Sequence, residues 1–259
     1  MENSIKKYDY IISLGGNCST ACQLVYRNLR PCAFPFDYFF LRDVEDLKKM
    51  ISELKSDYKN SFKKENFVEL VGDKRGCSKL YQYQDNVSGY NIIHMFHKPI
   101  EAKGEYEKVY KTIQKRLNRI MSLQNKNKNL CFILGIDFEP DKNILEDLYK
   151  TLKEKFGENI DTFFIMWNSK QDNTIQENNV TYIYTTQPSN LYDYEKTNVI
   201  WRFLDFCKIK PKFDNKILMI EGIKKGVQIK ILECINTIFR IRLYLAGFRL
   251  DICLGKLRD

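Results

Sequence analysis

A cysteine follows the first apolar run of the chain, at a position where its thiol could be chemically active. Residues 10–14 read YIISL, and a glycine pair, Asn17 and Cys18 come directly after them. Ser19 then opens a stretch with helical spacing of apolar residues, so Cys18 is expected in the first turn of a helix. Unpaired backbone N–H groups and the positive end of a helix dipole favour a thiolate there. The pattern predicts a nucleophile with a lowered pKa.

The residues beside Cys18 could hold the negative oxygen that forms when a thiolate attacks a carbonyl carbon. The glycine turn permits close backbone approach, and Gly16, Asn17 and Ser19 offer N–H groups and a side-chain amide. A second interpretation stays open, because free cysteine is often simply packed in a core. Cys22, one helical turn later, is expected to be a packing neighbour without a role.

A general base for this thiol has to come from one of two histidines, since the chain has only His94 and His97. Alternation along a strand puts His94 on the face of Ile92 and Phe96, and puts His97 on the opposite face. A structural or solvated role is the ordinary alternative for each of them. Because alternation separates the two rings, no zinc site and no other metal site is predicted.

The third member of a Cys/His site would be a carboxylate or an amide that orients the imidazole. Three residues lie near the ends of predicted strands or turns and could do this: Asp37, Asp137 and Asn168. Each of them also fits a turn or a helix cap. From residue chemistry alone, the choice among the three stays open.

The elements that must position these residues alternate between strands and helices. Apolar strands are predicted over residues 10–14, 90–96, 130–136, 162–167 and 180–184, with helices over 19–29, 44–58, 105–124 and 143–157. Continuous apolar strands between amphipathic helices indicate a sheet that is covered on both faces. The predicted fold is α/β, a mostly parallel, doubly wound sheet with helices on both faces, and ligands bind beyond the carboxyl ends of such strands.

The composition narrows the functional classes. Apolar residues make up 44% of the 259 residues, and the eight cysteines contain no CxxC pair, which indicates a globular protein with reduced thiols. The formal net charge is +9, yet no nucleic-acid-binding motif is present, so no nucleic-acid partner is predicted. The first apolar run is too short for a signal peptide, and a cytoplasmic location is expected.

The end of the chain reads differently from the rest. We expect one α/β domain over residues 1–215 and a basic, amphipathic helical extension over 216–259, because apolar and basic residues are mixed at helical spacing there. The apolar face would pack against the first domain or against a second copy in a homo-oligomer. Alternatively, residues 224–258 would make peripheral contact with the inner face of an anionic membrane.

Three motifs resemble those of a bacterial family described as papain-like cysteine peptidases. The family pattern is a strand, SLGxNC, a helix, a small residue with PFDW, and a strand that ends in HDF; here these read SLGGNC, AFPFDY and HMF. The resemblance covers the first hundred residues well and the 130–157 unit loosely. It implies Cys18 as nucleophile, His94 as base and Asp37 as the aspartate of PFDW. Tyr38 replaces the tryptophan, and Met95 replaces the aspartate after the histidine, so any role of that carboxylate is lost here.

Together, the residues and the resemblance predict an acyl-transfer enzyme, either a thiol hydrolase like a peptidase or an acyltransferase. Its substrate would be a small-molecule, peptide or glycan acyl compound. The chain is also similar in outline to Cys/His enzymes of polysaccharide biosynthesis, which implies coenzyme A as an acyl donor. The rival hypothesis is a non-catalytic binding module that is associated with a membrane-bound glycan-assembly system.

Overall fold

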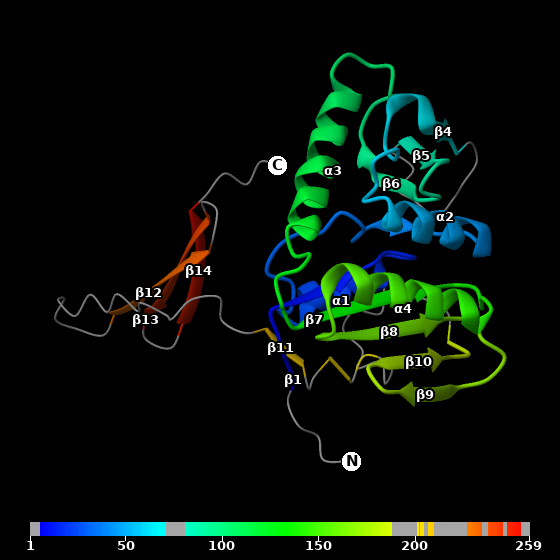
Figure 1. Cartoon of the computed structure of the whole chain (residues 1–259). Coiled ribbons are helices and arrows are strands. Elements are labelled where there is room, and N and C mark those ends of the chain that lie inside the picture. The colour runs from blue at the N-terminus through cyan, green and yellow to red at the C-terminus, as the bar shows by residue number, and fades with distance from the viewer. Residues whose placement is uncertain are drawn as a thin grey trace. The chain divides into compact units, whose positions relative to one another are not determined.

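The computed structural model describes residues 6–70, 81–187, 201, 203–204 and 207–209, together with the backbone of 227–234, 238–245 and 248–254. The chain forms two compact units, Met1–Lys210 and Pro211–Asp259. Figure 1 shows the elements of both units in chain order. The candidate site residues all lie in the first unit.

A five-stranded sheet forms the centre of the first unit. Its strands, in spatial order, are β2 (Tyr10–Ser13), β7 (Leu130–Ile136), β8 (Ile160–Met166), β10 (Val180–Tyr184) and β9 (Asn173–Glu177). Pairing is parallel from β2 to β10, and only β9 is antiparallel to its neighbour. Every residue of β7 is buried, as its unbroken apolar sequence LCFILGI predicts. The prediction of a mixed α/β fold with a mostly parallel sheet is confirmed.

A second, antiparallel sheet meets the central sheet at the end of β2. It consists of β3 (Phe39–Phe40), β6 (Asn91–Phe96), β5 (Tyr81–Asp85) and β4 (Phe67–Glu69), the last preceded by a short 3-10 helix, Lys64–Asn66. An isolated parallel bridge between Gly16 and Phe40 joins the two sheets. A separate parallel pair, β1 (Lys6–Tyr8) with β11 (Cys207–Ile209), completes the strands of this unit. The sheet that adjoins the end of β2 is antiparallel. A doubly wound, parallel strand order is therefore not seen among the described residues.

Helices cover both faces of the central sheet. Within the described ranges the helices are α1 (Ser19–Tyr26), α2 (Val44–Lys55), α3 (Glu105–Met121) and α4 (Lys142–Phe156). Leu24 of α1 shares a buried cluster with Ile133 of β7, whereas Leu148 of α4 shares a different cluster with Phe132 and Leu134. Alternate residues of β7 therefore face opposite helical layers.

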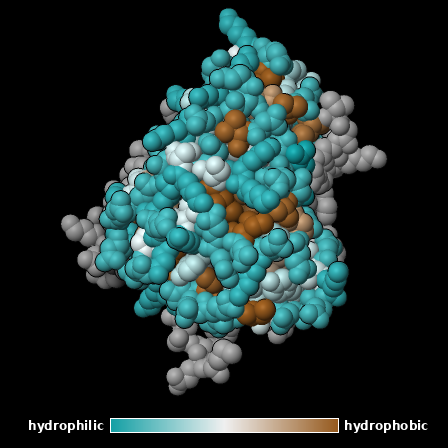
Figure 2. All heavy atoms as spheres, turned by 45° about the vertical axis from the view of Figure 1, so that its right-hand side comes forward, coloured by the Kyte–Doolittle hydropathy of each residue, from teal (hydrophilic) through white to brown (hydrophobic). Residues whose placement is uncertain are grey.

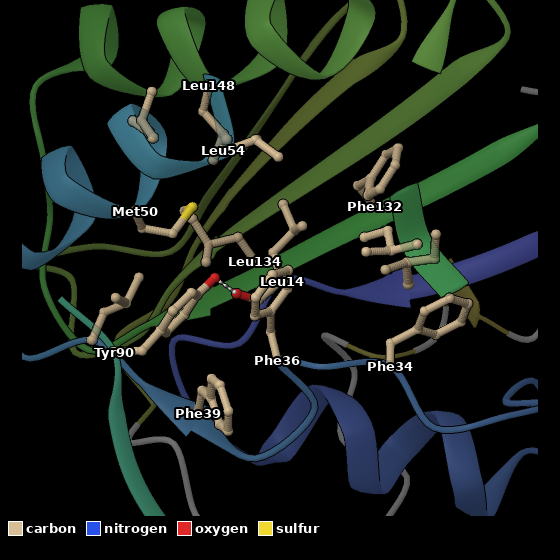
Figure 3. Packing of buried hydrophobic residues seen from close by; sticks show 14 of the residues in the cluster. Leu14, Phe34, Phe36, Phe39, Met50, Leu54, Tyr90, Phe132, Leu134 and Leu148 are labelled. Carbon is tan, nitrogen blue, oxygen red and sulfur yellow. Dashed lines mark hydrogen bonds between the residues drawn. The ribbon is translucent and has the colours of Figure 1, made fainter. Parts of the chain in front are cut away.

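The aromatic part of the core ties the two sheets together (Figure 3). Tyr90, just before β6, stacks on Phe36 with ring centroids 4.9 Å apart. Its hydroxyl donates a hydrogen bond of 2.8 Å to the backbone oxygen of Leu14, directly after β2. Both tyrosine contacts are buried, so the end of β2 is fixed relative to the start of β6.

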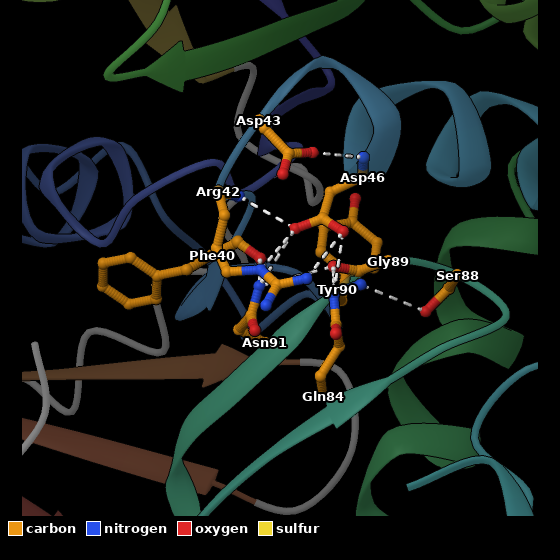
Figure 4. Close-up of polar contacts among 9 residues, drawn as sticks. All are labelled: Phe40, Arg42, Asp43, Asp46, Gln84, Ser88, Gly89, Tyr90 and Asn91. Atoms are coloured by element: carbon orange, nitrogen blue, oxygen red, sulfur yellow. Dashed lines mark hydrogen bonds and ion pairs between the residues drawn. The ribbon is translucent and has the colours of Figure 1, made fainter. Parts of the chain in front are cut away.

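A buried carboxylate fixes α2 against the antiparallel sheet (Figure 4). Asp46 is only 1% exposed and accepts hydrogen bonds from the guanidinium of Arg42 and from the side-chain amide of Gln84, at 3.0 and 2.8 Å. Asn91, the first residue of β6, donates to the same carboxylate at 3.4 Å. Asp43 caps α2 by accepting from the backbone N–H of Asp46 at 2.9 Å. The network positions the strand that carries His94.

The helical extension predicted for residues 216–259 is wrong over its described part. The structure has three antiparallel strands there, β12 (Val227–Cys234), β13 (Ile238–Leu245) and β14 (Phe248–Leu254). Apolar residues recur at every second position along β13 and β14, and this period suits a strand and not a helix. Residues 216–226 and 255–259 lie outside the described residues, as does part of the predicted membrane contact 224–258.

The visible face in Figure 2 is mostly hydrophilic, with small hydrophobic groups between polar side chains. Large exposed apolar side chains are scattered over several elements, at Val25, Tyr26, Val68, Tyr81 and Ile175. Among the described residues, no helix is both long and apolar enough to span a bilayer.

Candidate functional site

Two glycines place the Cys18 loop at the junction of the two sheets. Gly15 and Gly16 have φ angles of +81° and +88°, in the region that favours glycine. A Cβ on Gly16 would lie 2.2 Å from the backbone oxygen of Gly135 on β7. The Gly15 oxygen accepts from the N–H of Gly135 at 3.3 Å, and the Gly16 oxygen accepts from the N–H of Leu41 at 3.2 Å. The loop is therefore bonded to both sheets, and only glycine fits at residue 16.

Cys18 is the N-cap residue of α1, directly before the first turn in which the sequence predicts it. It is 6% exposed and belongs to a small buried cluster with Phe40 and Ile93. Asn17 stabilises the turn, because its Oδ1 accepts the backbone N–H of Ser19 at 3.1 Å. The Asn17 Nδ2 and the Ser19 hydroxyl are buried without a hydrogen-bond partner. These two groups are available to a bound oxygen atom beside Cys18.

The protonation state of Cys18 differs from the prediction. A side-chain hydrogen bond with Cys22, together with burial, raises the pKa of the Cys18 thiol above its usual range. The helix N-terminus was predicted to lower the pKa of this thiol. That effect is outweighed, because a neighbouring thiol and an apolar environment both favour the neutral form. Cys22 is thus a direct partner of Cys18 and not a silent neighbour. The free protein holds a neutral thiol at this position.

His94 lies in an irregular part of β6. Pairing with β5 passes from Tyr83↔Ile92 to Tyr81↔Phe96, so β6 contains two additional residues between these pairs. A bulge breaks the alternation of side chains and redirects them, and bulges are frequent next to active sites. The predicted assignment of His94 to the face of Ile92 therefore does not hold. The alternation argument assumed a regular strand.

The imidazole of His94 contacts the aromatic residues that surround Cys18. Its ring centroid lies 6.2 Å from that of Tyr38, in a T-shaped pair, and 6.3 Å from that of Phe40. Tyr38 packs against the cluster of Cys18, Phe40 and Ile93. Burial lowers the pKa of His94, so its imidazole is neutral at pH 7. Cys18 and His94 are thus brought to the same aromatic pair, without a hydrogen bond between them in the described structure.

His97 lies outside this site. Its side chain is exposed beyond the end of β6, and its backbone N–H donates to Glu105 Oε1 at 2.7 Å, at the start of α3. The structure therefore separates the two histidines, as the sequence predicts. The reason differs, because His94 lies in a bulge and His97 lies beyond the end of the strand. Among the described residues, no group of three or more potential metal ligands comes together.

Asp37 does not orient His94. The carboxylate is fully buried, and its Oδ2 accepts from Arg30 Nε and from the backbone N–H of Phe34, both at 2.8 Å. Its Oδ1 has no hydrogen-bond partner. The aspartate of the PFDY motif thus forms a buried ion pair in the loop that carries Tyr38. Its contact with the base is indirect, through Arg30 and the Tyr38 ring.

The other two candidates lie at the carboxyl ends of β7 and β8, as predicted. Asp137 is exposed, and its charge contributes to the raised pKa of Cys18. Asn168 is exposed with φ of +56°, and its backbone N–H donates to Gln187 at 3.1 Å, which is a turn geometry. Burial alone shifts the pKa of His94. The described structure therefore provides no carboxylate partner for the base.

Sequence reasoning missed a set of buried polar atoms behind the Cys18 loop. Thr20 Oγ1, Trp167 Nε1 and Asn17 Oδ1 lie 3.1, 3.3 and 3.4 Å from the point where a Cβ on Gly135 would be. The Thr20 hydroxyl and the Trp167 N–H have no hydrogen-bond partner in the structure. A small polar group or a water would satisfy them at low cost. The glycine in LCFILGI was the available signal, since glycine within a strand often marks close approach.

The chain was compared with known proteins. A family model described as "Putative papain-like cysteine peptidase" matches residues 9–224. No curated protein matches the chain. No solved structure matches it either.

Proposed function

Because the chain belongs to the family that this description names, we propose that it is a thiol hydrolase whose nucleophile is Cys18 and whose general base is His94. The match covers most of the chain, including every residue of the candidate site. It confirms the predicted resemblance of the chain to that family. A cysteine-based hydrolase is the activity that this membership favours.

One observation carries the proposal. The thiol at the start of α1 and the imidazole in the β6 bulge both border Tyr38 and Phe40, although they come from different sheets. A glycine loop without room for a Cβ and a strand bulge are costly local features, and such features concentrate at functional sites. A packed structural cysteine requires neither of them.

The mechanism follows from two neutral groups. The His94 imidazole accepts the Sγ proton of Cys18 while the sulfur forms a bond to the carbonyl carbon of the substrate. The Asn17 Nδ2 and backbone N–H groups at the start of α1 are the donors available for the oxyanion. The imidazolium then protonates the leaving group as the acyl–Cys18 thioester forms. Water, deprotonated by His94, attacks the thioester and releases the acid and the free thiol.

This pair differs from a preformed thiolate–imidazolium pair. A raised thiol pKa and a lowered imidazole pKa both favour the neutral forms, so the proton moves only during the attack. Hydrogen bonds between catalytic groups often tighten only when substrate is bound. Contact between Sγ and the imidazole is therefore expected in the substrate complex.

The test is acylation of the full chain by p-nitrophenyl acetate, with the acetyl group located by mass spectrometry. We expect acetyl–Cys18, loss of the burst of p-nitrophenol in Cys18→Ala, and a decrease in acylation rate of about 100-fold in His94→Ala. His97→Ala is the matched control and should retain the wild-type rate. Acetylation at other residues only, or equal effects of the two histidine variants, would show that the proposal is wrong.

A further inference from the structure

Three arginines gather near Tyr38, the aromatic residue that packs against the Cys18 cluster. The Arg30 guanidinium stacks on the Tyr38 ring at 5.5 Å, and its Nη2 lies 2.5 Å from Asp37 Oδ2. Arg119 of α3 donates to the backbone oxygen of Ala33, in the same loop. Arg116 lies one helical turn before Arg119 on the same side of α3. The cluster thus joins α3 to the loop between α1 and β3.

The cluster has more positive charge than its protein partners neutralise. The Asp37 carboxylate attracts Arg116, whereas Arg30 and Arg119 both repel it. Three guanidinium groups against one carboxylate leave an excess of two positive charges. The side chain of Arg30 is 14% exposed, and Arg116 is half-buried, so water screens this charge only in part. Charges that are withdrawn from water require a partner.

Arg116 is the member of the cluster that makes no hydrogen bond to a described protein group. Within the described part of the chain its guanidinium, which has five N–H donors, makes no hydrogen bond to a protein group. The Arg30 guanidinium donates hydrogen bonds to Asp37 and to the Tyr38 hydroxyl, and the Arg119 guanidinium donates to the backbone oxygen of Ala33. Burial, followed by the repulsion of its two neighbours, lowers the pKa of Arg116. An anion beside Arg116 would relieve the repulsion and accept hydrogen bonds from its N–H groups.

We propose that Arg30, Arg116 and Arg119 form a subsite for a phosphate monoester group of the substrate, beside the Tyr38 side chain that packs against the Cys18 cluster. This inference rests on the proposed function, since it assigns a substrate class to the same site. The excess of two positive charges matches a phosphate monoester, which carries close to two negative charges at neutral pH. Guanidinium groups bind phosphate oxygens with paired hydrogen bonds. The substrate is then an acyl compound with a phosphate beyond its reactive carbonyl.

The experiment titrates inorganic phosphate into the full chain at low ionic strength and measures binding by calorimetry. Phosphate should bind the wild type, and Arg116→Gln should weaken that binding about tenfold, the loss expected for charge-assisted hydrogen bonds. Lys115→Gln is the matched control, because it removes one charge from an exposed residue of the same helix. Arg116→Lys keeps the charge without the fork and should give an intermediate affinity, which provides a second variant if Arg116→Gln does not fold.

Each outcome decides the proposal. Equal weakening by Lys115→Gln and Arg116→Gln would show general attraction of anions and overturn the subsite. Acetate that binds more tightly than phosphate would overturn the phosphate assignment in favour of a carboxylate. Cys18→Ala should bind phosphate like the wild type. A wild-type chain that binds phosphate but is not acylated at Cys18 would therefore contradict the hydrolase, whereas a wild-type chain that is acylated but does not bind phosphate would contradict only the subsite.

Discussion

At the scale of single residues, the candidate site combines a thiol and an imidazole whose charged forms are both disfavoured. Burial acts in opposite directions on the two pKa values, because a thiol is charged when deprotonated and an imidazole when protonated. The result is a neutral pair near pH 7. The reactivity of Cys18 is then expected to depend on His94 and not on a stable thiolate.

This gives a prediction for the pH dependence of acylation. Protonated His94 cannot accept a proton, so the rate should fall on the acidic side of a pKa below 6.5, the ordinary value for histidine. Above that pKa the rate should level off through pH 8, because the raised pKa of Cys18 prevents a further increase from thiolate. Stopped-flow measurement of p-nitrophenol release between pH 5 and 9 checks this. A steady tenfold increase per pH unit would instead indicate a simple thiolate.

A second prediction concerns Asp37. Asp37→Ala leaves the guanidinium of Arg30 and the N–H of Phe34 without their acceptor, so the free energy of unfolding should decrease by about 3–5 kcal/mol. Urea titration followed by circular dichroism measures this loss. The folded fraction should still acylate Cys18 at a rate closer to wild type than His94→Ala does. A loss of acylation as large as that of His94→Ala would restore Asp37 as the residue that orients the base.

At the scale of elements, two irregular features position the reactive groups, the glycine loop after β2 and the bulge in β6. The glycine loop was readable from the sequence, since consecutive glycines between a strand and a helix indicate a tight turn. The bulge was not, because nothing in NIIHMF shows which residues pair with β5. Face assignments from alternation fail wherever the pairing register shifts.

Substitution of a loop glycine tests this element. Gly16→Ala places a Cβ 2.2 Å from the Gly135 oxygen at a φ of +88°, so it should destabilise the fold by several times the cost of backbone conformation alone. Gly104→Ala is the control, since Gly104 has φ of +79° with open space around it and should lose only about 1–2 kcal/mol. Thermal denaturation of both variants compares the two. Equal losses would mean that close approach does not constrain Gly16.

Much of the remaining secondary structure could be predicted, and the failures share a physical cause. Asp43 is the N-cap residue of α2, and the apolar run LCFILGI forms β7. Both elements are readable from the sequence because capping residues and continuous apolar runs are local signals. The segment from Val227 to Leu254 was predicted as helix because apolar residues at spacings of three and four coexist with alternation. Tertiary contacts then decide between the two periods. The arginine cluster was also missed because it depends on tertiary contacts. Its members lie on elements that are far apart in the sequence.

At the scale of the whole molecule, the central sheet and the antiparallel sheet of the first unit are joined by polar contacts at the end of β2. The Gly16–Phe40 bridge and the hydrogen bond from Tyr90 to the Leu14 oxygen are two of them. Both lie among buried side chains. The relation between the sheets therefore depends on buried side chains more than on a continuous ladder.

Tyr90→Phe tests the joint. The buried oxygen of Leu14 loses the tyrosine hydroxyl while the ring and its stacking on Phe36 remain, so unfolding free energy should decrease by about 1–3 kcal/mol. Tyr26→Phe is the control, because Tyr26 is 58% exposed, and it should change stability by about 0.5 kcal/mol or less. Urea titration of both variants measures the difference. A Tyr90→Phe protein as stable as the control would show that the sheets are held without this bond.

The position of the seam between the sheets has a mechanical consequence. Cys18 follows a strand of the parallel sheet, whereas His94 lies on a strand of the antiparallel sheet. A small slide or rotation of one sheet against the other would change the gap between sulfur and imidazole, while the ladders within each sheet stay intact. The reactivity of Cys18 thus depends on the relative position of the two sheets. A substrate bound between the two sheets would therefore change the distance between Cys18 Sγ and the His94 imidazole, which is the distance of the proton transfer.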